Sequence, residues 1–187
     1  MFVAEAPGRL GAEVTGVPLL GDRTGDRFEE LLKGMGWSRS AVFITNAVLC
    51  NPRDSDGNND RPTAKEIRSC SKLLKRTIEV VNPRLVVALG RVALEALAAI
   101  ASHECDLKSS VGKVVIWHHR HLGVLYHPGP RTVIHRPWTD QVKDAQKIAD
   151  TARKLKLKVC VEEPDFIDDG RFLTGSVATL ENTCDLE

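Results

Sequence analysis

The sequence predicts an α/β domain of three layers, in which helices cover both faces of a mostly parallel central sheet of about four strands. Short apolar runs alternate with stretches of helical periodicity along the chain, which is typical of this class. Residues 85–89 (LVVAL) form a continuous apolar run, as expected for a central parallel strand covered on both faces. Polar segments rich in glycine and proline follow the apolar runs, and in such sheets the ligand site lies at the carboxyl ends of the strands.

The first third of the chain contains two expected strands. Residues 1–4 are apolar and precede a Pro-Gly pair, which indicates a strand leading into a loop. Five glycines within 8–25 predict a long structured loop, and helical spacing of apolar residues predicts a helix over 26–33. Residues 41–47 (AVFITNA) are expected to form the second strand, and 50–62 an exposed polar loop.

The remainder of the chain continues the alternation. Thr63 with Glu66 three residues later forms a capping-box pattern, which predicts a helix from there to about Val81. The other expected elements are a strand over 85–89, a helix over 92–100, strands over 114–117 and 122–126, a helix over 140–155 and an edge strand over 159–161.

Length and composition favour one domain over residues 1–160, followed by an acidic tail over 161–187. No apolar run is long enough to span a bilayer and no signal peptide is evident, so we expect a soluble, cytoplasmic protein without a membrane partner. Five cysteines, an odd number in a chain of 187 residues, argue against a secreted disulfide scaffold.

The net charge of +1 conceals an asymmetry. The last 27 residues carry eight acidic side chains and one basic one, so the rest of the chain has a net charge of +8. A basic body with an acidic tail suits a polyanionic partner such as DNA. An ordinary solvated surface with a loose acidic end is the alternative explanation.

Five segments carry a more specific signal. They are VAEAPGRLGAEVTGVPLLG (3–21), FITNAVLCNP (43–52), RPTAKEIRSC (61–70), PRLVVALGRVALEAL (83–97) and LYHPGPRTVIH (125–135). In this order and at this spacing they resemble the motifs of the iron–sulfur (family 4-like) branch of the uracil-DNA glycosylase superfamily. The resemblance implies a base-excision repair enzyme that flips uracil, or another deaminated base, out of DNA and hydrolyses its N-glycosidic bond.

The resemblance also assigns catalytic roles. His127 is the expected donor to the uracil carbonyl, where charge develops as the bond breaks. Glu5 and Glu13 are the candidate carboxylates for positioning water, and Glu13 matches only the second of the family's two acidic positions. A histidine that caps a loop, and a Glu5 that only accepts backbone hydrogen bonds, are the structural alternatives.

Asn46, at the end of an apolar strand, is expected to read the uracil edge because an amide offers both a donor and an acceptor. A turn-capping Asn is the alternative. Leu19 replaces the family's stacking aromatic, so we expect the substrate range to differ from uracil. The other expected base contacts are Ala6, Pro7 and Gly8, and the expected contacts to the DNA backbone are Pro128, Gly129, Arg131, His135 and Arg136.

Cys50 and Cys70 match two of the four cysteines that hold the family's [4Fe–4S] cluster. A cluster is therefore expected only in a longer form of the protein, and two unligated thiols are the alternative. A zinc site needs four ligands as well.

Two other functions remain open from the sequence. The same fold could bind uracil-containing DNA without cleaving it, or trap it covalently. It could also hydrolyse free nucleosides or nucleotides. In each of the DNA hypotheses we expect a monomer.

Overall fold

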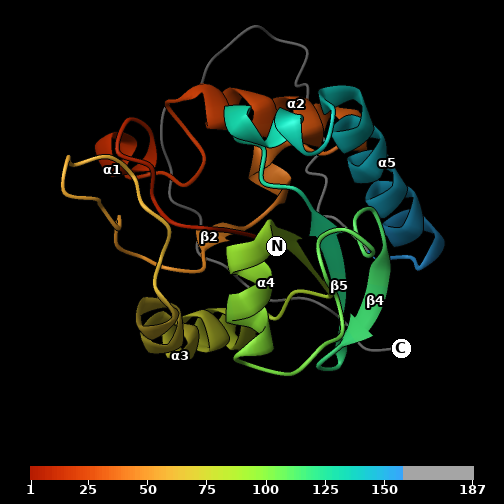
Figure 1. The fold of residues 1–187 in the computed structure, drawn as a ribbon. Helices are drawn as coiled ribbons and strands as arrows, with labels where there is room; N and C mark the ends of the chain where they lie inside the picture. The colour runs from red at the N-terminus through yellow and green to blue at the C-terminus, as the bar shows by residue number, and fades with distance from the viewer. Residues whose placement is uncertain (158–187) are drawn as a thin grey trace, which may run out of the picture.

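The computed structural model describes residues 1–157 and contains a five-stranded sheet of order β2-β1-β3-β5-β4 (Figure 1). The strands are β1 (Phe2–Ala4), β2 (Ile44–Asn46), β3 (Leu85–Leu89), β4 (Val114–Trp117) and β5 (Arg120–Leu125). The first four strands in this order pair in parallel, and β4 pairs antiparallel to β5 at the edge. The predicted α/β class is confirmed, and the antiparallel edge strand adds one strand to the four that run in parallel.

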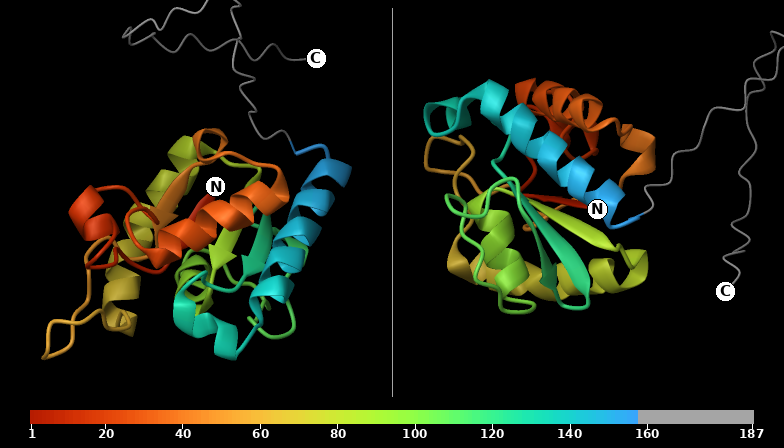
Figure 2. Two further views of the ribbon diagram at one scale, coloured as in Figure 1. Left: turned by 90° about the horizontal axis from the view of Figure 1, so that it is seen from above. Right: turned by 90° about the vertical axis from the view of Figure 1, so that its right-hand side faces the viewer.

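Helices cover both faces of the sheet, as expected (Figure 2). α2 and α5 lie on one face, and α3 and α4 lie on the other. The helices are α1 (Ala12–Thr15), α2 (Arg23–Met35), α3 (Ala64–Val81), α4 (Arg91–Ala98) and α5 (Trp138–Lys154), with short 3-10 turns η1 (Arg39–Ala41) and η2 (Pro130–Ile134).

The central strand shows why its sequence is apolar throughout. All five residues of β3 are buried. Val87 and Leu89 belong to the apolar cluster beneath α2 and α5, whereas Val86 and Ala88 belong to the cluster beneath α3 and α4. Successive side chains of a strand point to opposite faces, so a strand covered on both sides needs an apolar residue at every position.

The predicted start of α3 is confirmed in detail. The Thr63 hydroxyl accepts a hydrogen bond from the backbone N–H of Glu66, and the Glu66 carboxylate accepts one from the backbone N–H of Thr63. The helix ends at Asn82, whose φ of 45° lies in the left-handed region, and Pro83 follows it. Local capping chemistry therefore fixes both ends of this helix.

Two expectations about the N-terminal third need correction. α2 begins at Arg23 rather than at Asp26, because Asp22 caps it. The segment 8–25 is not a loop throughout, since it contains α1. The expected edge strand over 159–161 and the acidic tail over 161–187 lie outside the described residues. Within residues 1–157, none of the helices combines the length and the apolar character that a membrane crossing requires.

Candidate active site

A cavity of about 710 Å³ opens at the carboxyl ends of the parallel strands. Four segments line it: 5–12 after β1, 19–24 before and at the start of α2, 51–60 after β2, and 127–132 after β5. Its volume lies in the range of ordinary ligand sites. The parallel strands bring these segments, which are far apart in the sequence, to one edge of the sheet.

The structure brings eight of the predicted site residues into this cavity and leaves the others outside its lining. The lining includes Glu5, Ala6, Pro7, Gly8, Leu19, His127, Gly129 and Arg131. The predicted residues that do not line it are Glu13, Asn46, Pro128, His135, Arg136, Cys50 and Cys70.

His127 lies directly beyond β5 and has a defined protonation state. Its Nδ1 accepts a hydrogen bond of 3.2 Å from the backbone N–H of Gly129. Because Nδ1 is the acceptor, a neutral ring carries its proton on Nε2. Burial lowers the pKa of His127 from 6.5 to about 4, and the negative charge of Asp22 opposes that shift. At neutral pH the side chain is therefore a neutral N–H donor.

A glycine makes room for this histidine. Gly90, at the end of β3, has a φ of 94°, a conformation that favours glycine. A Cβ at this position would also come within 3.2 Å of the His127 Cβ. The Leu-Gly turn predicted from the sequence thus lets two neighbouring strand ends approach each other closely.

Glu5 is a partly buried carboxylate in the cavity wall. Burial raises its pKa; nearby Arg61 lowers it, and Glu95 raises it. Arg61 and Glu95 form an ion pair of 2.6 Å with each other. Glu5 therefore holds its negative charge less firmly than an exposed glutamate does.

Asn46 is the last residue of β2, in register with Ala4 on β1. Only 5% of its surface is exposed, and no other described residue hydrogen-bonds its side-chain amide. Neither amide atom of Asn46 is among the fully enclosed polar atoms that lack a hydrogen bond, so the amide retains some exposure and is available to a ligand. It lies at the sheet edge from which the cavity opens, although it does not form part of the lining.

Glu13 is engaged elsewhere. Its Oε2 accepts hydrogen bonds from Asn51 at 2.7 Å and from Arg53 at 2.6 Å. These contacts lower the pKa of the carboxyl group. The side chain is exposed and joins α1 to the loop over 51–60. The carboxylate that the sequence offered as a water-positioning group therefore serves as a loop contact in this structure.

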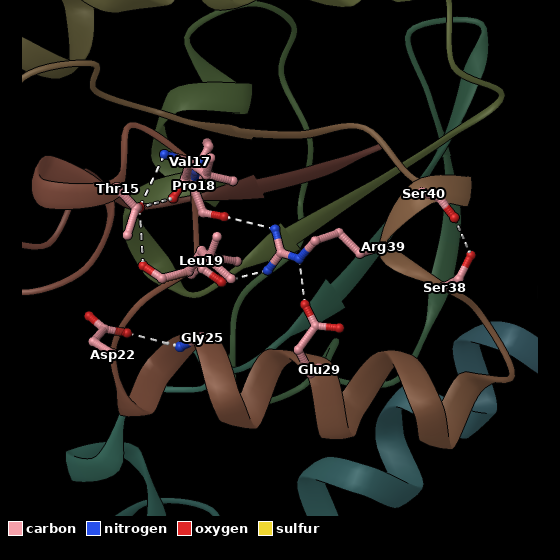
Figure 3. Close-up of polar contacts among 11 residues, drawn as sticks. Thr15, Val17, Pro18, Leu19, Asp22, Gly25, Glu29, Ser38, Arg39 and Ser40 are labelled. Carbon is pink, nitrogen blue, oxygen red and sulfur yellow. Dashed lines mark hydrogen bonds and ion pairs between the residues drawn. The ribbon is translucent and has the colours of Figure 1, made fainter. Parts of the chain in front are cut away.

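Leu19 is 9% exposed and has a φ of 53°, an unusual conformation for a residue with a side chain. Arg39 stabilises it by donating hydrogen bonds to the carbonyl oxygens of Pro18 and Leu19, and Arg39 also pairs with Glu29 (Figure 3). Gly25 completes the arrangement, because a Cβ there would lie 2.7 Å from the Leu19 oxygen. The backbone of Leu19 is thus held in place by the Arg39 guanidinium group and by close contact with Gly25 of α2.

Arg136 was predicted to contact DNA phosphates, but its guanidinium group is already paired. It donates two hydrogen bonds, of 2.8 and 2.9 Å, to Asp144, whose side chain is fully buried. This pair joins the segment after η2 to α5. Arg131 and His135, by contrast, are exposed, and Arg131 lies at the cavity.

Among the lining residues that the sequence did not predict are Asp22 and Asn51. Asp22 lines the cavity and caps α2 by accepting a hydrogen bond of 2.9 Å from the Gly25 N–H. The sequence signal was an Asp three residues before Gly25, at the start of a helical pattern. Asn51 also lines the cavity, and its Oδ1 is buried without a hydrogen-bond partner among the described residues.

The cysteines within the described range do not form a metal centre. Cys50 is exposed after β2, and Cys70 is partly buried on α3. Among residues 1–157, no group of three or more Cys, His, Asp or Glu side chains is placed to hold a metal ion. The residues present thus do not fit a four-ligand cluster, and we derive no chemical step through one.

The doubly wound sheet, with polar side chains converging at the carboxyl ends of its strands, defines an α/β ligand-binding domain. The chain belongs to the Uracil DNA glycosylase superfamily, whose family model matches residues 1–156.

Characterised relatives agree with this assignment. The chain is 33% identical to a type-4 uracil-DNA glycosylase of Archaeoglobus fulgidus over 142 residues, which cover 73% of this chain and 67% of the relative. It is 30% identical to a type-4 uracil-DNA glycosylase of Sulfurisphaera tokodaii over 158 residues, 81% of this chain and 69% of the relative. It is 32% identical to a type-5 uracil-DNA glycosylase of Pyrobaculum aerophilum over 146 residues, 71% of this chain and 62% of the relative.

Proposed function

We propose that this chain is a DNA-repair glycosylase that flips uracil, or another deaminated base, into the cavity and hydrolyses its N-glycosidic bond. The observation that carries the proposal is the state of His127 in the cavity. Its ring is neutral, and its Nδ1 accepts a hydrogen bond from the Gly129 N–H. The chain also belongs to a superfamily of uracil-DNA glycosylases. The relatives named type-4 and type-5 uracil-DNA glycosylases support the same reaction.

His127 would act on the departing base. As the bond between C1′ and the base breaks, its electron pair leaves with the base, and negative charge develops on a carbonyl oxygen. The Nε2–H group of His127 donates a hydrogen bond to that oxygen. Since Gly129 already holds the ring, little reorganisation is needed, and such a donor stabilises the transition state by about 3 to 4 kcal/mol.

The base itself would be recognised at the ends of β1 and β2. Asn46 presents its amide to the base edge, and the backbone of Ala6 to Gly8 approaches one face of the base. Leu19 packs on the other side. An aliphatic side chain forgoes the stacking that contributes about 1–3 kcal/mol per base, so discrimination among flat bases rests more on hydrogen bonds here.

The distribution of charge favours DNA over a free nucleotide. Carboxylates lining the cavity are Glu5, Asp22, Asp54 and Asp60. They would repel a phosphate inside the cavity but would favour a sugar that becomes cationic. Exposed Arg9 and Arg131 at its wall are suited to the backbone phosphates of a strand that stays outside, with Pro128, Gly129 and His135 as neighbouring contacts. We place this activity in residues 1–160, ahead of the acidic segment 161–187, and inside the cell.

The test uses labelled single- and double-stranded oligonucleotides that carry one uracil or one hypoxanthine. Incubation followed by alkali should break the strand at the modified base. Tight binding without breaks would instead indicate a non-catalytic binder, and an adduct that survives hot SDS would indicate a covalent trap. Cleavage of free deoxyuridine without DNA affinity would indicate a nucleoside hydrolase. A sizing column run on the same sample tests the expected monomer.

A further inference from the structure

α3 carries an excess of positive charge that the cavity does not use. The helix has five basic and two acidic side chains, whereas none of the other α-helices within residues 1–157 has a net charge above +1. None of the five basic residues lines the cavity, and all of them are exposed. They are Lys65, Arg68, Lys72, Lys75 and Arg76, and we call them the α3 stripe.

The five side chains project from one side of the helix. Successive residues of a helix turn by about 100°, so these five point within an arc of about 100°. Ile67, Leu74 and Ile78 lie outside this arc and pack into the apolar cluster that α3 and α4 form with the sheet. The α3 stripe therefore faces solvent.

The cations at the start of the α3 stripe have no neutralising neighbour. Glu66 accepts hydrogen bonds at the N-cap of the helix. Glu79 pairs with Lys75 at 3.9 Å and with Arg76 at 3.7 Å. Like charges three or four residues apart on a helix repel each other, so an anionic partner stabilises such a surface. The cations that form no ion pair with a residue of the 1–157 range are Lys65, Arg68 and Lys72.

The α3 stripe begins near the cavity and leads away from it. Asp60 lines the cavity, and Thr63, three residues later, is the N-cap of α3. Figure 1 shows α3 continuing from the loop over 51–60 on the face of the sheet opposite α2 and α5. From Lys65 to Arg76 the helix rises by about 16 Å. This length matches about five phosphates of one DNA strand, at about 3.4 Å each.

We propose that the α3 stripe binds the phosphates of a single DNA strand that leaves the cavity, as a contact that carries no sequence information. The inference rests on the proposed glycosylase function, because the flipped nucleotide fixes where this strand starts. The strand has to turn at the cavity mouth to follow the helix. Duplex DNA is stiff over about 150 base pairs, whereas a single strand turns readily, so the surface fits a single-stranded flank.

Replacement of the three unpaired cations by Gln tests this contact, because Gln removes the charge and is a good helix former. The triple variant Lys65→Gln, Arg68→Gln, Lys72→Gln is titrated with a single strand that carries one 2′-fluorinated deoxyuridine, whose glycosidic bond resists cleavage. Each phosphate contact to a single strand contributes about 0.7 to the slope of log affinity against log salt concentration. We expect the slope of this variant to be shallower than that of the wild type by about 2.

A matched variant removes the same charge from another part of the surface. Lys33→Gln, Arg153→Gln, Lys154→Gln replaces three exposed residues near the ends of α2 and α5. Its slope should differ from that of the wild type by less than about 0.5, because these cations lie away from the expected path of the strand.

Two further measurements separate charge from helix structure and one strand from two. The charge-preserving variant Lys65→Arg, Arg68→Lys, Lys72→Arg should keep the wild-type slope. On a fully paired duplex of the same sequence, the Gln variant should differ from the wild type by less than about 1 in slope. An equally large change on duplex and single strand would contradict the assignment to a single-stranded flank.

A wild-type slope of the Gln variant on the single strand would overturn the proposal, as would a change of equal size in the matched variant of α2 and α5. The slope is a binding measurement and requires no excision. Failure of the wild-type protein to excise any base would instead overturn the proposed function, so the two failures are distinguishable.

Discussion

The two sides of the cavity are held in different ways. On the His side, formed by residues 127–132 and the start of α2, the contacts run through backbone groups and half-buried side chains. Arg27 donates a hydrogen bond of 3.1 Å to the Gly129 oxygen and stacks on Trp138 with its guanidinium carbon 5.1 Å from the ring centre. On the loop side, formed by residues 51–60, Glu13 pairs with Arg53 through side chains that are 40% and 45% exposed.

This difference indicates that the two sides have different tasks. Exposed ion pairs contribute little to stability and weaken with salt, whereas partly buried contacts persist. A donor that stabilises a transition state must be held in place before the reaction begins. The His side is therefore suited to the chemistry, and the loop side is suited to adjusting around different substrates.

The largest effect should come from His127→Ala. Removal of the held donor is expected to lower single-turnover excision by about 100- to 1,000-fold, with DNA binding largely retained. A quench assay with labelled uracil DNA measures the rate. His119→Asn is the matched control, because His119 is exposed in the turn between β4 and β5 and its φ of 61° is one that Asn tolerates. Undiminished excision by His127→Ala would remove the basis for the mechanism.

Arg136→Ala should act on stability. Loss of the guanidinium group leaves the fully buried Asp144 with only Lys147, 3.2 Å away, as a charged partner. We expect the free energy of unfolding to fall by about 3 kcal/mol. Urea titration measures it, with the exposed Arg76→Ala on α3 as the control. If Arg136→Ala instead kept full stability and lost DNA affinity, the result would support the phosphate contact that the sequence predicts for Arg136.

The third prediction concerns pH. His127 has a pKa of about 4 in the folded protein and 6.5 when exposed, so the unfolded chain takes up the proton first as the pH falls. The contribution of this residue to stability is complete above pH 6.5 and is lost progressively toward pH 4, by up to about 3 kcal/mol. Urea titrations of wild type and His127→Ala across this range should differ in slope. Parallel curves would contradict a partly buried histidine that is neutral in the folded protein.

The smallest effect should come from the loop side. Glu13→Gln removes the charge that holds Arg53, yet it keeps a hydrogen-bond acceptor for Asn51. We expect the DNA concentration required for half-maximal excision to rise by less than about tenfold. The rate at saturating DNA should stay nearly unchanged. A salt series provides the check, because the difference between Glu13→Gln and wild type should shrink as salt screens the pair.

Features set by local sequence were predictable. The apolar run of β3, the capping box of α3 and the position of His127 after β5 all follow from neighbouring residues and strand order. The family motifs also predicted a shared site for Glu5 and Gly8, and both residues line the cavity together with His127.

Pairings of charged side chains between different structural elements were not predictable. From the sequence, Arg136 was expected to be a free cation, but it pairs with Asp144 of α5. Glu13 was expected to be a free carboxylate, but it pairs with Arg53, which lies 40 residues away in the sequence. The role of Asp22 as the N-cap of α2 was missed for a different reason. The apolar spacing began the predicted helix at Asp26, which left the true cap inside a presumed loop.

The most direct test compares the two sides on one substrate. Single-turnover excision of uracil by His127→Ala and Glu13→Gln is measured at saturating DNA, beside wild type. The account predicts a loss of about 100-fold or more for His127→Ala and a nearly wild-type rate for Glu13→Gln. A reversed order, with Glu13→Gln inactive and His127→Ala active, would contradict the assignment of the chemistry to the His side.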